Sequence, residues 1–91
     1  MDRIIKASGE VIETKPQNGT DYSLEELQAI VGGYIECLWS VDGKETMVLN
    51  EEGKLEGLDC NDKATEWFVE NYGNHDYVVG DVLICDSEHI K

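Results

Sequence analysis

The residue types best suited to metal binding gather towards the C-terminal end of the sequence. His75 and Asp76 are adjacent, Asp81 follows them, and His89 lies in an acidic tail. A metal site would need histidine nitrogen and carboxylate oxygen to converge on one ion at about 2.0–2.2 Å. Neither histidine has a metal-binding residue four residues after it, and the acids do not fit the spacing of a calcium-binding loop. We therefore interpret these residues as solvated surface groups and predict no metal and no cofactor.

Nucleophilic chemistry would fall to the three cysteines, Cys37, Cys60 and Cys85. A catalytic thiol needs an electropositive setting and a general base, whereas the charge around these thiols is negative. Cys37 and Cys85 fall within predicted strands, so Cys60 is the one reactive candidate. An odd number of cysteines without a Cys-x-x-Cys pair is also a poor zinc or redox pattern. With no signal peptide or apolar span, the sequence predicts a protein of the reducing cytoplasm whose thiols are mostly core fillers.

The net charge excludes further classes of function. Twenty acids stand against seven bases, which gives a formal net charge of −13. Such a chain offers no basic surface to a nucleic-acid backbone and is repelled by anionic membranes. The acids are interleaved with apolar residues, as on a folded surface, and form no block typical of a disordered tail. Residues 1–20 hold three acids and three bases, so the whole excess lies in the rest of the chain.

The N-terminal third predicts a hairpin and a helix. Two short segments with β-branched centres, Arg3–Ala7 and Glu10–Lys15, are typical of a β-hairpin. Ser23 and Glu26 form a capping box before a predicted helix over residues 24–31. A glycine pair then ends the helix. Because these glycines follow the helix, they cannot form a phosphate-binding loop at its amino terminus.

The middle of the chain predicts a β-meander. Tyr34–Val41 has the alternation of a strand, and an Asp-Gly turn leads into Glu45–Asn50, whose Met47 and Leu49 are expected to face the core. Leu55–Leu58 is at best a short third strand.

The last third predicts a helix and a buried strand. Asn61 or Asp62 can cap a helix that presents Trp67 to the core. Tyr77–Cys85 is apolar on both faces, which favours a strand in the interior of the sheet. The aromatic side chains, Trp39 included, are expected to be mainly core.

Together these elements predict an α+β fold with a single domain over residues 1–86. We expect an antiparallel sheet of about four or five strands, one or two helices packed against it, and a frayed polar tail over residues 87–91. Tyr34, Tyr72 and Tyr77 are expected to face outward as interface anchors. An exposed edge at the first strands could pair with a second copy of the chain, so the sequence is compatible with a homodimer.

Four motifs carry a resemblance to one family. Residues 24–36 read LEELQAIVGGYIE, residues 50–58 read NEEGKLEGL, residues 61–65 contain Asn-x-x-Ala-Thr, and residues 79–84 read VGDVLI. In this order they resemble the family known as domain of unknown function 3846, found in bacteria, phages and mobile elements, over about residues 1–86. A fuller helix and loop over residues 67–76 depart from shorter members. The family implies no reaction and no catalytic residues, but its association with mobile elements favours an accessory or anti-defence role.

The segment from Asn50 to Asn61 is the most individual part of the chain. As a functional element it would be an exposed acidic loop that contacts a partner. As a structural element its glycines supply turns and Asn61 caps the following helix, which is the plainer interpretation. The candidate interaction surface consists of Glu51, Glu52, Glu56, Asp59, Asn61, Asp62 and Thr65.

Three classes of function stay open. We expect a non-catalytic interaction protein whose acidic surface binds a basic protein patch, in its sharpest form as a mimic of the DNA phosphate array. The alternative is a protein that sequesters a small molecule or a signalling nucleotide, which a pocket containing Arg3, Lys6 or Lys63 would favour. The third is an enzyme, which would show histidine, cysteine and acid clustered in a cleft.

Overall fold

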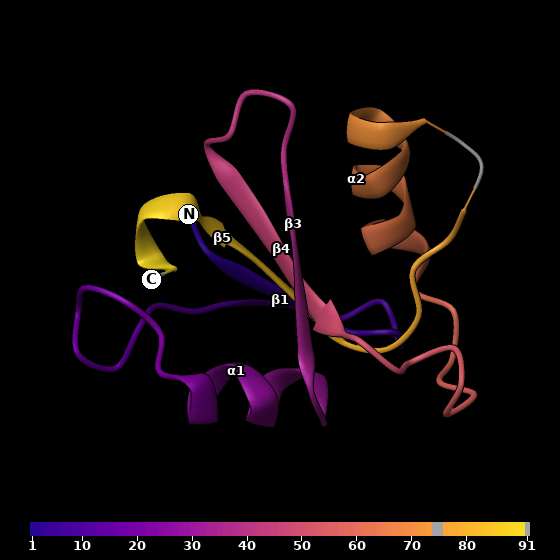
Figure 1. The fold of residues 1–91 in the computed structure, drawn as a ribbon, viewed down its shortest axis with the longest axis horizontal. Coiled ribbons are helices and arrows are strands. Elements are labelled where there is room, and N and C mark those ends of the chain that lie inside the picture. The colour runs from indigo at the N-terminus through magenta and orange to yellow at the C-terminus, as the bar shows by residue number, and fades with distance from the viewer. Residues whose placement is uncertain (74–75, 91) are drawn as a thin grey trace.

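The computed structural model describes residues 1–73 and 76–90. These described residues form five strands, two α-helices and a 3-10 helix η1 (Figure 1). Their bounds are β1 Arg3–Ile5, β2 Val11–Glu13, α1 Leu24–Val31, β3 Ile35–Trp39, β4 Glu45–Asn50, α2 Asp62–Tyr72, β5 Val82–Asp86 and η1 Ser87–His89. Neither α-helix in the described part of the chain is long and apolar enough to cross a membrane.

The strands form one antiparallel sheet in the order β2-β1-β5-β4-β3. The last strand in the sequence, β5, therefore lies in the middle and pairs with β1 on one side and β4 on the other. In the register, Leu83 faces Ile4 of β1 and Val48 of β4. The α+β class, the N-terminal hairpin and the interior position of the last strand are all confirmed.

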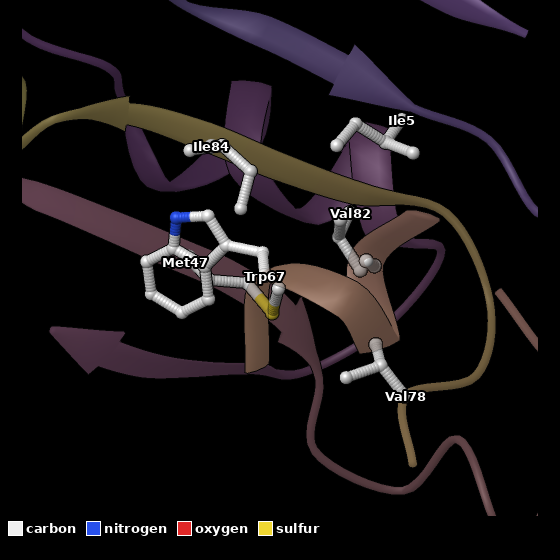
Figure 2. Packing of buried hydrophobic residues seen from close by; sticks show 7 residues of the cluster. Ile5, Met47, Trp67, Val78, Val82 and Ile84 are labelled. Carbon is white, nitrogen blue, oxygen red and sulfur yellow. The ribbon is translucent and has the colours of Figure 1, made fainter. Parts of the chain in front are cut away.

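The alternation of side chains in β4 and β5 gives the sheet two apolar faces. Val82 and Ile84 point to one face, where they pack with Met47 of β4 and Trp67 of α2 (Figure 2). Leu83 and Cys85 alternate with them, and the second face also holds Val48, Leu27 and Val31. Helix α1 thus covers one face and α2 the other, and the two helices lie on opposite sides of the sheet in Figure 1.

The two helices begin as the sequence predicts. In α1 the Ser23 hydroxyl accepts from the Glu26 N–H, and the Glu26 carboxylate accepts from the Ser23 N–H, which completes the capping box. Gly32 ends the helix with a φ of 81°, a left-handed conformation that suits glycine. In α2 the side chain of Asn61 accepts from the Ala64 N–H.

Three details of the middle segment differ from the sequence prediction. Leu55–Leu58 is not a strand, because the loop after β4 turns back on itself and the Leu58 N–H donates to the Gly53 carbonyl. Strand β4 buries Met47 and Val48 equally, since a helix lies on each face, so it has no single inner side. Trp39 is 50% exposed because it ends the edge strand β3.

The C-terminal residues 87–90 are folded onto the domain and are not a frayed tail. The backbone N–H of Tyr22 donates to the His89 carbonyl at 3.0 Å, and the Ser87 hydroxyl bonds the buried Thr46 hydroxyl at 2.8 Å. Ile90 packs against the core on the α1 side. Polar residues here find partners inside the fold, which composition alone does not reveal. Lys91, which the same prediction includes, lies outside the described residues.

Asn61 connects three parts of the fold. Its side chain is 1% exposed. Its Nδ2 donates to the carbonyls of Ile5 at 2.9 Å and Gly80 at 2.8 Å, while its Oδ1 caps α2. The end of β1, the approach to β5 and the start of α2 are therefore held by one amide, because each of its polar atoms is satisfied by a buried backbone group.

We predict that Asn61→Asp lowers the free energy of unfolding by about 2–4 kcal/mol, because the carboxylate keeps the helix cap but turns an acceptor towards two buried carbonyl oxygens. Urea denaturation measures the change. The matched control is Gln17→Glu, the same amide-to-acid change in an exposed loop, with an expected effect below about 0.5 kcal/mol. Equal stability of the two variants would contradict the role assigned to Asn61.

Candidate functional site

The structure divides the predicted interaction surface into exposed acids and internal residues. Five of its members are exposed: Glu51, Glu52, Glu56, Asp59 and Asp62. Asn61 is interior, so it cannot meet a partner. The Thr65 hydroxyl donates to the Asn61 carbonyl at 2.8 Å and accepts from the Val78 N–H at 2.9 Å. Asn61 and Thr65 therefore have structural roles within the fold and do not form part of an exposed interaction surface.

Asn50 fixes the start of the acidic loop. Its Nδ2 donates to the Val31 carbonyl at 3.2 Å and to the Glu56 carboxylate at 3.1 Å, and its Oδ1 accepts from the Glu52 N–H at 2.8 Å. A Cβ on Gly33 would lie 2.9 Å from Asn50 Nδ2, so a glycine permits this approach. The end of α1 and the segment after β4 belong to the first and second of the four sequence motifs. They thus meet at the buried side-chain amide of Asn50.

The fourth motif, residues 79–84, contacts the same loop at Gly80. This residue has a φ of +77°, and a Cβ there would lie 2.8 Å from Leu58 Cδ1. Its N–H donates to the Asp59 carbonyl at 2.7 Å. Much of the motif pattern is therefore explained by close packing of loops at one end of the sheet, without any catalytic role.

Beside this junction lies a cleft of about 230 Å³, which we call the Lys54 cleft. Its apolar lining comes from several elements and consists of six side chains: Leu38, Leu49, Leu55, Phe68, Val78 and Val79. The other side chains that line it are polar or aromatic: Glu36, Asn50, Glu51, Lys54, Asp76 and Tyr77. No local pattern in the sequence indicates this site, because its residues come from β3, β4, the acidic loop, α2 and the segment before β5.

Lys54 is held in the cleft by two contacts. Its ammonium group pairs with the Asp76 carboxylate and lies 4.4 Å from the centre of the Tyr77 ring. The hydrogen bond from Lys54, followed by one from the Tyr77 N–H, lowers the pKa of the Asp76 carboxyl. The carboxylate is therefore ionised at neutral pH, and a cation is bound between a negative charge and an aromatic face. The one signal in the sequence was a lysine within an otherwise acidic loop.

A second, more open hollow of about 520 Å³ contains Arg3. Its lining also includes Lys44, but Asp42, Glu45 and Glu70 outnumber the two cations. The Arg3 guanidinium already lies 3.4 Å from Glu45 Oε2. The hollow therefore offers an anion no net positive charge.

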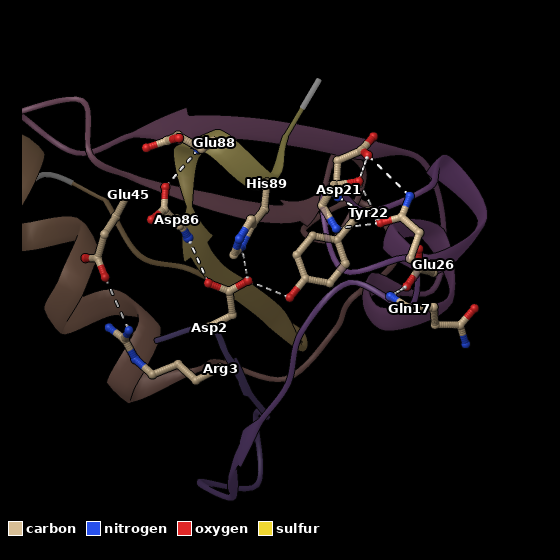
Figure 3. Close-up of polar contacts among 12 residues, drawn as sticks. Asp2, Arg3, Gln17, Asp21, Tyr22, Glu26, Glu45, Asp86, Glu88 and His89 are labelled. Carbon is tan, nitrogen blue, oxygen red and sulfur yellow. Dashed lines mark hydrogen bonds and ion pairs between the residues drawn. The ribbon is translucent and has the colours of Figure 1, made fainter.

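A buried cluster of polar side chains joins the two ends of the described chain (Figure 3). The Asp2 carboxylate, 3% exposed, accepts from the Tyr22 hydroxyl at 2.7 Å, the Asp86 N–H at 2.9 Å and His89 Nδ1 at 2.6 Å. Burial alone would raise the pKa of Asp2, but these hydrogen bonds outweigh burial and lower it. An ionised carboxylate only accepts, so the proton of this hydrogen bond is carried by Nδ1 of His89.

The cysteines provide no activated thiol beside this polar cluster. Burial, followed by the negative charge of Asp2, raises the pKa of Cys85 to about 12, so its thiol is protonated at neutral pH. Burial, followed by Glu36, also raises the pKa of Cys37. Cys60 is exposed and lies at an isolated bridge to Val79.

The candidate metal ligands in the sequence either make contacts that stabilise the fold or lie outside the described residues. Asp81 accepts from the Ala7 N–H at 3.0 Å, and Asp86 caps the short helix η1. Within residues 1–73 and 76–90, no three histidine, cysteine or acidic side chains gather as metal ligands would. His75 lies outside the described residues.

We predict that Asp2→Asn lowers the free energy of unfolding by about 2–4 kcal/mol at neutral pH, because a buried ionised acceptor of three hydrogen bonds is lost. The folded-state pKa of Asp2 lies below its usual value of 3.8. Its contribution is therefore complete above about pH 4 and is lost as the pH falls through the lowered pKa. Denaturation curves measured over a range of pH should give free energies of unfolding for the wild type and the variant that become equal only at acidic pH.

The control for this prediction is Glu13→Gln, which removes one negative charge from an exposed residue of β2. Its stability should follow that of the wild type at every pH. If the free energies of unfolding of Asp2→Asn and the wild type were already equal at about pH 5, the ionised state assigned to Asp2 would be contradicted.

Comparison with known proteins agrees with the resemblance seen in the motifs. No curated protein and no solved structure matches the chain significantly. A family model described as "Domain of unknown function (DUF3846)" matches residues 1–90. The match spans the hairpin, both helices, the acidic loop and the central strand, and so the chain belongs to the DUF3846 family.

Proposed function

We propose that this protein is a non-catalytic, cytoplasmic interaction protein whose acidic surface binds a basic protein surface. The observation that supports it best is the row of acids on α2. Asp62, Glu66 and Glu70 are exposed and spaced four residues apart, which places them on one side of the helix. We call this row the α2 stripe.

The C-terminal part of the α2 stripe is unfavourable for the helix that bears it, whereas Asp62 lies in the first turn, where an acid suits the helix dipole. Like charges four residues apart destabilise a helix by about 0.2–0.5 kcal/mol per pair. The last turn of α2 contains no basic residue, and Glu70 lies there, near the negative end of the helix dipole. Mixed charges would keep the protein soluble without this cost, so a role in binding accounts for the stripe better than solubility does.

The acids of the preceding loop extend this charge. Glu51, Glu52, Glu56 and Asp59 are exposed and come directly before α2. In the described part of the chain, the ion pairs are Arg3–Glu45, Lys54–Asp76 and His89–Asp2, so the charge on the stripe and the loop is not neutralised within the protein. Such a field speeds association with a basic partner and makes it dependent on salt. A mimic of DNA phosphates that occupies a host defence protein is the sharpest form of the proposal, and an origin in a phage or mobile element suits it.

Sequestration of a nucleotide receives less support. The Lys54 cleft is smaller than the roughly 300–1,000 Å³ typical of small-molecule sites. The larger hollow contains Arg3, as that alternative requires, but its acids outnumber its cations. Both cavities would therefore repel a phosphate group.

We predict that Glu70→Lys stabilises the protein by about 0.5–1 kcal/mol. The positive charge of the lysine would interact favourably with the negative end of the helix dipole and would pair with Glu66 one turn earlier. The matched change Glu25→Lys, in the first turn of α1, should destabilise it by a similar amount. Thermal unfolding measures both. A loss of stability in Glu70→Lys would show that the stripe does not oppose folding.

The binding proposal is tested by pull-down from bacterial lysate at low and high salt. The variant Asp62→Asn/Glu66→Gln/Glu70→Gln should recover about tenfold less basic protein at low salt than the wild type. A control, Glu10→Gln/Glu13→Gln/Glu25→Gln, has the same net charge but changes exposed acids elsewhere, and should recover nearly as much as the wild type. Recovery of no basic protein by the wild type at low salt would overturn the proposal.

A further inference from the structure

The Lys54 cleft already binds one cation, which belongs to the protein itself. The ammonium group of Lys54 lies between the Asp76 carboxylate and the face of the Tyr77 ring. Lys54 and Asp76 are about half exposed, with side-chain exposures of 45% and 50%. An exposed ion pair of this kind contributes little to stability, so another cation can compete for the position.

The cleft has more negative charge than Lys54 neutralises. Glu36 and Glu51 also line it, and the ion pairs found among the described residues include neither of them. The lining of the cleft thus holds three carboxylates and one ammonium group, and only the Asp76 carboxylate pairs with that group. A second positive charge would be attracted to this opening, whereas a phosphate would be repelled.

The remaining lining of the cleft selects the shape of that cation. Leu38, Leu49 and Phe68 provide an apolar surface that suits the methylene groups of a long basic side chain. A planar guanidinium can stack on the Tyr77 ring and bond a carboxylate through two N–H groups, which an ammonium cannot do. A volume of about 230 Å³ matches a single side chain better than a cofactor.

We propose that the Lys54 cleft receives one arginine side chain from the basic protein surface, and that this arginine displaces Lys54 from Tyr77. The proposal rests on the proposed function and names the contact through which the acidic surface recognises its partner. Lys54 then serves as an internal substitute that covers Asp76 and Tyr77 until a partner arrives. The α2 stripe attracts the partner, and the cleft recognises an arginine within it.

The test is an NMR titration of the isotope-labelled full chain with the peptide acetyl-Gly-Arg-Gly-amide at low salt. Chemical-shift changes should centre on Leu38, Leu49 and Tyr77. The corresponding lysine peptide should bind more weakly. The citrulline peptide, which has nearly the shape of arginine without its charge, should cause no comparable change.

Variants of the cleft should change the affinity in opposite directions. Lys54→Met removes the competing charge and should tighten binding of the arginine peptide about three- to tenfold, a gain that a misfolded protein cannot give. Tyr77→Leu and Glu36→Gln should each weaken binding by about the same factor. The controls are Trp39→Leu and Glu13→Gln, exposed residues that do not line the cleft, and they should leave the affinity unchanged.

The outcomes separate this inference from the proposed function. Shift changes that centre on the α2 stripe, or equal binding of the arginine and citrulline peptides, would overturn the arginine site. A Lys54→Met variant that binds no better than the wild type would overturn the displacement of Lys54. In each case salt-dependent recovery of a basic protein would still support the proposed function, whereas failure of that recovery counts against the acidic surface itself.

Discussion

The fold depends on the burial of β5 between β1 and β4. This strand is buried on both faces over Val82–Cys85 and pairs along both edges, so no other element contributes as much to both apolar clusters. Helix α1 needs the side chains of one face, and α2 needs those of the other. The polar contacts of Asp2 and Asn61 then fix the ends of this arrangement, because each joins the neighbourhood of β5 to a segment far away in the sequence.

Local signals predicted the elements well. The capping box of Ser23 and Glu26 gave the start of α1 to the residue, and apolar residues on both faces placed β5 in the interior of the sheet. The errors arose where a partner distant in sequence decides the structure. Residues 87–90 are polar in composition but bond Thr46 and Tyr22, and the edge position of Trp39 follows from the strand order, which no local pattern contains.

The site was harder to predict than the fold. Exposure of the acids in the loop could be expected from their charge, but the internal role of Asn61 was one of two open interpretations. The Lys54 cleft could not be found from spacing, because Phe68, Tyr77 and Leu38 approach only when α2 and the segment before β5 close over the end of β3 and β4. Glutamates and aspartates are so frequent in this chain that their presence alone distinguishes no position.

The central position of β5 also has a consequence for the order in which the protein folds. The hairpins β1–β2 and β3–β4 are local and can form early, but the pairing of Ile4 with Leu83 must close almost the whole chain. Contacts of such long sequence separation are slow to form. Until β5 arrives, β1 and β4 each present an unpaired apolar edge, which is the kind of surface through which partly folded chains aggregate. The strong negative charge of the chain then has a second use, since mutual repulsion keeps such intermediates apart while the sheet is incomplete.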